Sequence, residues 1–250
     1  IGRLVGSEMC IRDSLWLNKL GERAVDTGHN DEARSWLSRA AAMATVHNER
    51  ARCVILRNQG YLLEQSGDLE AAMRCYTEAL PLATALGRQR MEGMLLARMG
   101  FVFFHQIKND EAEAYFTAAL RIMRRIGDRV EEAANLGRIG RIRARESKIE
   151  EALQHYEDTL RIVRELGDRQ REMVWLGNTA SVLMDLWRLD EAAARYQQAN
   201  ALAERLNDRY NQAHWLGNLG TLNHSRGALP EALSYYCLLY TSDAADEHSW

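Results

Sequence analysis

Residues 130–169 read VEEAANLGRIGRIRARESKIEEALQHYEDTLRIVRELGDR, and this stretch decides the fold. It contains two helix-length segments, each with apolar residues at three-to-four spacing. A polar break at residues 146–148 separates the two segments, and Gly167-Asp168-Arg169 closes the second. The stretch therefore predicts a pair of helices joined by a short turn.

The same pattern returns every forty residues in both directions. Glycine recurs in register at Gly60, Gly100, Gly140 and Gly220, and Ala180 takes the fifth place. An alanine stands twelve residues after each of these positions, and an aromatic ring follows that alanine by four residues. Self-similarity at a period of 20–50 residues is typical of a solenoid. The alanines are Ala72, Ala112, Ala152, Ala192 and Ala232, and the rings are Tyr76, Phe116, Tyr156, Tyr196 and Tyr236.

Both ends of the chain depart from this repeat. Residues 5–14 (VGSEMCIRDS) and 237–247 (CLLYTSDAADE) look like translated sequencing adaptors, because a DNA sequence that encodes Met9–Asp13 encodes Leu238–Thr241 in its reverse complement, one frame over. We therefore expect residues 1–14 and 237–250 to be adaptor-derived scars. The array then spans residues 15–236, in units near 15–50, 51–90, 91–129, 130–169, 170–209 and a truncated 210–236.

The composition favours a helical chain. The sequence has only 2 prolines, and 46% of its residues are hydrophobic. A net charge of −3 gives no general attraction to nucleic acid or to anionic membranes. Cys53 and Cys75, the two cysteines of the array, have no metal-ligand spacing, and no apolar run is long enough to span a bilayer. These features predict a reduced, cytoplasmic protein with no membrane or nucleic-acid partner.

The in-register glycines indicate close packing. A glycine inside a helix costs about 1 kcal/mol relative to alanine, so its recurrence requires a packing reason. We expect Gly140 to lie against Ala152 of the second helix, where two small residues let the helix axes approach. Tyr156 is then expected to fill the wedge toward the next first helix.

On these residues the chain resembles the tetratricopeptide repeat family, whose glycine, alanine, aromatic and alanine positions match Gly60, Ala72, Tyr76 and Ala79. The usual period of that family is 34 residues. The forty-residue variant, with first helices such as Leu176-Gly177-Asn178, is similar to repeats of cell-polarity adaptors and of bacterial signalling or transcription-activator proteins. The resemblance implies an all-α, right-handed solenoid of antiparallel helix hairpins, about five and a half repeats long, whose first helices line a concave groove.

No pattern in the sequence predicts catalysis. The histidines do not occur as HxxxH or beside a carboxylate at ligand spacing, and no phosphate-binding glycine loop or nucleophile elbow is present. The acidic pairs Glu131-Glu132 and Glu150-Glu151 stand at expected helix starts, where they complement the helix dipole. We therefore expect no enzyme activity, no cofactor and no metal site.

Candidate partner-binding residues come from positions that recur on the first helices. Arg138, Arg141 and Arg145 are spaced i, i+3 and i+7, which places them on one face of one helix. Phe101 and Phe104 are predicted to face the same groove. We leave open that the arginines form a solvated face paired with glutamates, and that the phenylalanines pack between repeats. The positions two residues before the in-register glycine or alanine are Asn58, Arg98, Arg138, Asn178 and Asn218.

The leading hypothesis is a protein-interaction scaffold. An extended or helical peptide would lie along the groove, with its carboxylates held by the arginines and its backbone by the asparagines. The alternative is an effector-sensing regulatory region of a multidomain bacterial signalling NTPase or transcription activator, which a P-loop or helix-turn-helix upstream of Leu15 would select. RNA binding is disfavoured because the predicted basic patch is local while the whole chain is acidic. Partner identity and oligomeric state do not follow from the sequence.

Overall fold

The computed structural model describes residues 2–44 and 48–247, and within these ranges every element of regular structure is an α-helix. The predicted all-α hairpin fold is therefore confirmed. Residue 1 and residues 248–250, the outer ends of the two predicted adaptor segments, lie outside the described part. The helices are α1 (Gly2–Asp26), α2 (Asn30–Met43), α3 (Glu49–Gln65), α4 (Leu69–Ala85), α5 (Gln89–His105), α6 (Asn109–Ile126), α7 (Arg129–Arg145), α8 (Ile149–Glu165), α9 (Arg169–Asp185), α10 (Leu189–Arg205), α11 (Arg209–Ser225) and α12 (Leu229–Glu247).

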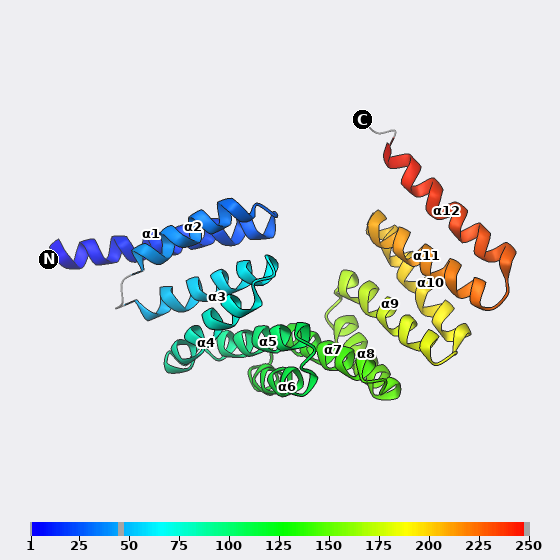
Figure 1. Ribbon diagram of the computed structural model, residues 1–250, viewed down its shortest axis with the longest axis horizontal. Helices are drawn as coiled ribbons and strands as arrows, with labels where there is room; N and C mark the ends of the chain where they lie inside the picture. The colour runs from blue at the N-terminus through cyan, green and yellow to red at the C-terminus, as the bar shows by residue number, and fades with distance from the viewer. Residues whose placement is uncertain (1, 45–47, 248–250) are drawn as a thin grey trace. The chain divides into compact units, whose positions relative to one another are not determined.

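The chain forms two compact units, Ile1–Asp128 and Arg129–Trp250. The first contains α1 to α6 and the second α7 to α12, and within each unit every helix packs against the next one along the chain (Figure 1). Helices α1 and α12 each continue across a predicted adaptor boundary. The adaptor origin of those end segments stays a prediction.

Each of the hairpin turns contains a residue in the left-handed conformation, and in the second hairpin an acidic helix cap follows it. Gly67 takes φ +83°, and the Asp68 side chain then accepts a hydrogen bond of 3.0 Å from the Ala71 amide at the start of α4. Trp187 holds the matching position in the fifth hairpin at φ +57°, with 74% of its surface exposed. A bulky residue in this conformation costs on the order of 1–3 kcal/mol, so the turn geometry is imposed by the two helices that it joins.

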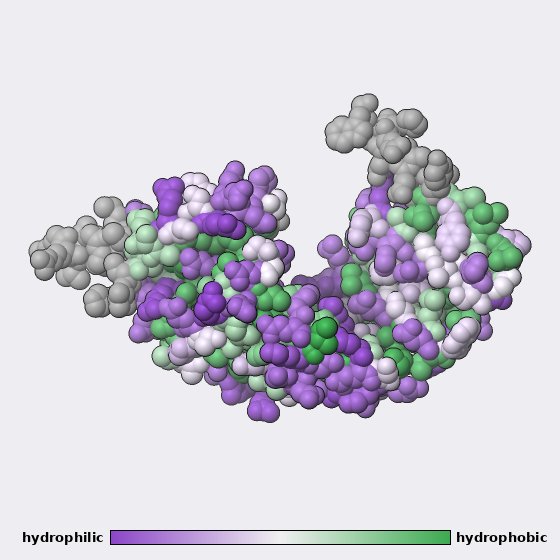
Figure 2. Space-filling view, viewed as in Figure 1, coloured by the Kyte–Doolittle hydropathy of each residue, from purple (hydrophilic) through white to green (hydrophobic). Residues whose placement is uncertain are grey.

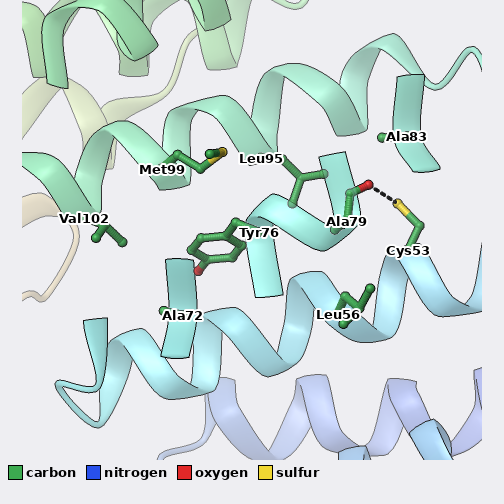
Figure 3. Packing of buried hydrophobic residues seen from close by; sticks show 9 residues of the cluster. All are labelled: Cys53, Leu56, Ala72, Tyr76, Ala79, Ala83, Leu95, Met99 and Val102. Carbon is green, nitrogen blue, oxygen red and sulfur yellow. Dashed lines mark hydrogen bonds between the residues drawn. The ribbon is translucent and has the colours of Figure 1, made fainter. Parts of the chain in front are cut away.

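The core of the second hairpin is organised around Tyr76. This ring is fully buried between α3 and α5, beside Leu95 and Met99. In the same cluster the Cys53 thiol donates to the Ala79 carbonyl at 3.6 Å (Figure 3). The packing is close because α3 presents only Gly60 beneath the ring. A Cβ at Gly60 would lie 2.5 Å from Tyr76 Cε1, which no real side chain tolerates.

The same contact recurs at Gly140 and adds to the expected role of the glycines. A Cβ at Gly140 would meet the ring of Tyr156, at 2.6 Å from its Cε1 atom, and the expected approach of Gly140 to Ala152 stays a prediction. The glycine is needed because the aromatic ring of the same hairpin rests on it, while the buried alanine lies one turn away. Tyr156 also reaches the next hairpin, as predicted, since its ring lies 5.3 Å from that of Trp175.

A second row of glycines joins successive hairpins in the second unit. Trp175 of α9 lies against Gly137 of α7, and Trp215 of α11 lies against Gly177 of α9. A Cβ at either glycine would come closer than 3.0 Å to the tryptophan ring. At Gly217, one repeat further on, a Cβ would have a single neighbour within 4 Å among the described side chains, Leu239 Cδ2 at 3.9 Å. Each tryptophan therefore acts as a knob that fills a side-chain-free notch on the preceding first helix.

An ion-pair cluster also links the fourth and fifth hairpins. The buried carboxylate of Glu172 accepts hydrogen bonds from Arg164 of α8 at 2.8 Å and from Arg169 at 2.6 Å. Burial alone would raise the pKa of Glu172, but the two arginines outweigh it and hold this pKa below its usual value. The ionised carboxylate therefore contributes to stability near neutral pH.

Exposed apolar side chains are prominent on α12. Leu229, Leu233 and Leu238 are each more than half exposed. Figure 2 shows hydrophobic surface over the C-terminal hairpin, whereas polar residues predominate on much of the remaining visible surface. No described helix of the chain is both long and apolar enough to cross a membrane.

The notch packing predicts opposite effects for two matched substitutions. Gly177→Ala forces the buried Trp215 ring to shift, and we expect it to lower the free energy of unfolding by about 1–2 kcal/mol, since overpacking outweighs the gain in helix propensity. Gly217→Ala adds a methyl group that meets Leu239 at an ordinary van der Waals distance, and it should stabilise the chain by up to about 1 kcal/mol. Urea unfolding followed by circular dichroism measures both values. If both variants changed the free energy of unfolding by the same amount in the same direction, the packing of Trp215 on Gly177 would not require a residue without a side chain.

The Glu172 cluster predicts an acid-sensitive link. Because the folded pKa lies below the unfolded value, the stabilisation is complete above about pH 4.5 and is lost as the pH falls through the folded pKa. Glu172→Gln should therefore lower the melting temperature at pH 7, and this deficit should shrink as the pH falls below about 4.5. The exposed Glu204→Gln serves as control. If the melting-temperature difference between Glu172→Gln and the parent chain stayed constant as the pH fell, the ionised Glu172 carboxylate would not be what stabilises this contact.

Candidate functional site

The first helices of the first unit surround a hollow of about 200 Å³. All of its lining residues come from α1, α3 and α5, so the second helices take no part in it. These are the helices on which the sequence placed the candidate binding residues. The lining residues are Glu22, Val25, Arg57, Asn58, Tyr61, Met94 and Arg98.

Asn58 and Arg57 are held by neighbouring side chains in this hollow. Arg57 pairs with Glu22 at 2.8 Å and donates a second hydrogen bond to the side-chain oxygen Oδ1 of Asn58 at 2.7 Å. The Asn58 amide donates in turn to Asn18 at 3.0 Å, and both asparagines are buried. Asn58 therefore forms part of the wall that joins α1 to α3.

Arg98 is also fixed within the first unit. It donates to the carboxylate of Glu64 at 2.9 Å and lies over the Tyr61 ring, 4.4 Å from its centroid. The buried Glu64 accepts a second hydrogen bond of 2.8 Å from the Tyr76 hydroxyl. Burial, followed by the negative charge of Glu64, raises the pKa of Tyr76 far above its usual value, so this hydroxyl remains a donor. The positive charge of Arg98 is thus balanced by the Glu64 carboxylate within the same unit.

The second unit has a larger hollow of about 430 Å³ between α7 and α9, here called the α7/α9 hollow. Arg138 and Arg141 line it from α7, and Arg171 lines it from the first turn of α9. Trp175 and Val174 supply apolar surface beside them. Ala134, Asp168 and Gln170 complete the lining.

Positive charge predominates in the α7/α9 hollow. Its lining includes three arginines and one carboxylate, Asp168. That carboxylate accepts from the Arg171 amide at 2.9 Å and forms an ion pair with the Arg171 side chain. These hydrogen bonds, with the Arg171 amide as the first cause, hold the pKa of Asp168 below its usual value. Arg145 stands one turn beyond Arg141, and burial together with the Arg141 charge lowers its pKa.

The structure brings together two pairs of the predicted residues. Asn58 and Arg98 line the hollow of the first unit, and Arg138 and Arg141 line the α7/α9 hollow. Arg145 is exposed but lies outside this lining. The other predicted residues lie along the first helices: Phe101 is half-buried with its ring 4.3 Å from His105, Phe104 is buried, Asn178 is half-buried, and Asn218 lies 3.3 Å from His214 Nε2.

Several lining residues were not predicted. Met94, Ala134 and Val174 share one register position, six residues before the in-register glycine or alanine, and this periodicity could have identified them. Glu22 and Arg171 could not be found in this way, because their place in the hollows depends on which side chains neighbouring helices offer. In the described part of the chain, no group of three His, Cys, Asp or Glu side chains is suited to hold a metal ion.

Two segments match a known family. Residues 91–165 and residues 58–84 each match the tetratricopeptide repeat. No curated protein matches the sequence significantly.

Solved structures with similar folds share little sequence with this chain. BtubC from P. vanneervenii superposes with a TM-score of 0.72 at 18% identity, over 96% of this chain and 93% of that protein. A signal transduction ATPase with a tetratricopeptide repeat sensor, from Pyrococcus horikoshii, gives 0.76 at 13% identity over 95% of this chain, which spans 38% of the ATPase. NprR in complex with its cognate peptide NprX gives 0.67 at 15% identity over 94% of this chain and 67% of NprR. At these identities the similarity shows the fold alone.

The contrast between Arg98 and Arg141 predicts different costs of removal. Arg98→Ala leaves the buried Glu64 carboxylate with the Tyr76 hydroxyl alone, and we expect a loss of about 1–3 kcal/mol in the free energy of unfolding. Arg141→Ala removes an exposed side chain and should cost less than about 1 kcal/mol. Urea unfolding of both variants tests this contrast. Equal unfolding midpoints would show that Glu64 does not depend on Arg98.

Proposed function

The chain is a tetratricopeptide repeat protein, and on that premise we propose that it is a protein-interaction scaffold whose first-helix face binds an acidic peptide or helix. The α7/α9 hollow carries this proposal. It gathers three arginines on a chain whose net charge is −3, so its charge is a local feature. Guanidinium groups bind carboxylates through paired, charge-assisted hydrogen bonds.

The roles of the candidate residues differ between the two units. In the second unit, Arg138 and Arg141 hold the acidic groups of the partner, with Arg145 extending the positive surface. Asn178 and Asn218 on the following first helices are placed to bind its backbone. In the first unit, Asn58 and Arg98 shape the wall of a charge-balanced hollow, where Tyr61 and Met94 contact apolar groups of the partner. Phe101 stands beyond that lining as an apolar flank.

The repeat architecture supports a binding role. Stacked hairpins present equivalent positions of successive first helices side by side, which suits an extended ligand. NprR, whose fold is similar, is seen in complex with a peptide. The free Cys53 and Cys75 thiols are in keeping with a reducing, cytoplasmic location.

A second candidate function is an effector-sensing region that regulates an attached catalytic or DNA-binding part. The similarity to the tetratricopeptide repeat sensor of a signal transduction ATPase favours it. The two functions differ in what else the gene encodes. A P-loop or a helix-turn-helix in the same reading frame selects the regulatory role, and its absence from the complete gene would remove that role.

Charge reversal at the hollow tests the scaffold. We expect Arg138→Glu with Arg141→Glu to weaken binding of fluorescein-labelled, Asp/Glu-rich peptides at least tenfold, since each charge-assisted hydrogen bond contributes about 1.5–3 kcal/mol. Fluorescence anisotropy measures the affinity, and circular dichroism confirms that helicity is kept.

The matched control is Arg161→Glu with Arg205→Glu, which makes the same charge change at exposed positions on the second helices α8 and α10. This control should bind nearly as well as the parent chain. Equal affinities for the two double variants, with both folded, would remove the α7/α9 hollow from the binding site.

A further inference from the structure

The two tryptophan knobs of the second unit use one interface twice. Each ring packs on the glycine that lies thirty-eight residues before it, Trp175 on Gly137 and Trp215 on Gly177. A Cβ at these glycines would lie 2.0 Å and 2.1 Å from the Cη2 atoms of the respective rings, so neither contact accepts a side chain. The interface therefore has two parts that repeat along the array, a tryptophan on the later hairpin and a notch on the earlier one.

The same series leaves one glycine without a tryptophan, on α11. Gly217 follows Gly177 by forty residues and is half-buried, whereas Gly137 and Gly177 are buried. Among the described side chains, Leu239 is the one that would come within 4 Å of a Cβ at Gly217, and its distance of 3.9 Å is an ordinary contact. Within the described part of the chain, no ring therefore fills the notch at Gly217.

The second helix beside this notch is also uncovered. Tyr236 of α12 is 39% exposed, although the equivalent Tyr76 is fully buried because α5 covers it (Figure 3). Leu233 is 64% exposed, although the equivalent Met73 packs against the cluster that α5 completes. Leu233 and Tyr236 are three residues apart on one helix face. Together with Gly217, they form what we call the tail face, which has the features that earlier hairpins use to bind the next first helix.

Trp16 of α1 occupies the register position of the two tryptophan knobs. The first repeat is one residue short, so Gly21 corresponds to Gly60. The packing supports this alignment, because a Cβ at Gly21 would lie 2.7 Å from Leu37 Cγ, just as a Cβ at Gly60 would lie 2.5 Å from Tyr76 Cε1. Trp16 stands five residues before its glycine, as the knobs of α9 and α11 stand five residues before the alanine or glycine in the same register.

Trp16 is exposed, unlike residues that share its position in later hairpins. Ile55 is buried in a cluster with Leu17 and Ala40 of the preceding hairpin, and Leu95 is buried against α4. Trp16 is instead 60% exposed, and α1 is the first described helix of the array. An indole ring has a large apolar surface that gains free energy when it is buried. The chain thus has a knob without a notch on α1 and a notch without a knob on α11.

We propose that copies of this chain associate head to tail, with Trp16 of one copy packed into the notch at Gly217 of the next. Helix α1 of the incoming copy then packs on the tail face as α9 packs on the α7–α8 hairpin. Because the two surfaces differ, the contact is heterologous, and repeated addition of copies gives a closed ring or an open chain. The contact does not involve the α7/α9 hollow, so its test is independent of the proposed peptide binding.

Sedimentation velocity of the whole chain tests this association, in a reducing buffer that keeps the exposed Cys237 free. We expect the average mass to rise with protein concentration through the micromolar range. Trp16→Ala should weaken association by about tenfold or more, since buried tryptophans are often the largest contributors to an interface. Trp187→Ala removes another exposed tryptophan, from a hairpin turn, and should associate as the parent does.

Two results of this experiment would overturn the proposal. One is a parent chain that stays monomeric at every concentration up to millimolar. The other is a Trp16→Ala variant that associates as strongly as the parent chain.

A single methyl group tests the notch from the other side. Gly217→Ala places a Cβ where the incoming Trp16 ring must lie, at the distance that Gly137 and Gly177 avoid. Association should therefore weaken by about tenfold, since overpacking a tight contact is unfavourable, while circular dichroism shows the helicity of the parent chain. Unchanged association of a folded Gly217→Ala would show that no ring enters this notch and would overturn the proposal.

Mixing two blocked variants distinguishes head-to-tail contact from a symmetric one. Trp16→Glu keeps only its tail face, and Leu233→Glu keeps only its Trp16, so each should be monomeric alone. Mixed in equal amounts, they should form a one-to-one dimer and nothing larger. A dimer of either variant alone would indicate symmetric pairing, larger species would indicate non-specific aggregation, and a mixture that stays monomeric would exclude this pairing of surfaces. Each of these three results would overturn the proposal.

Discussion

Close contact between an aromatic ring and a helix position without a side chain is the constraint on which the rest of the structure depends. Within hairpins, Tyr76 packs on Gly60 and Tyr156 packs on Gly140. Between hairpins of the second unit, Trp175 and Trp215 pack on glycines in the same way. These contacts fix the rotation of each first helix about its own axis. Because one side of the helix is committed to rings, the other side is available for polar and charged residues.

The two units use that available side in different ways. In the first unit, Arg57 and Arg98 are balanced by Glu22 and Glu64, so their cost of desolvation is offset within the chain and the hollow is nearly neutral. In the second unit, Arg138 and Arg141 share their hollow with a carboxylate that caps α9. Arginine is therefore a structural residue in one hollow and a candidate ligand-binding residue in the other, although both occupy related repeat positions.

Much of the fold could be predicted because the sequence repeats. The period fixes which residues are equivalent, and the i, i+3 spacing placed Arg138 and Arg141 on one face of a helix. The buried network around Arg98 could not be predicted in this way, because Glu64 and Tyr76 reach it from two other helices. The surroundings of Gly140 show the same limit: the sequence shows that space is needed there, but only the structure shows that the Tyr156 ring occupies it.

Amide hydrogen exchange of the chain, measured with and without a bound acidic peptide, tests the central claim most directly. The account predicts that the ligand slows exchange in α7 and in the first turns of α9, with little change in α8 and α10. Protection confined to α8 and α10, with α7 unchanged, would contradict a binding face built from the first helices.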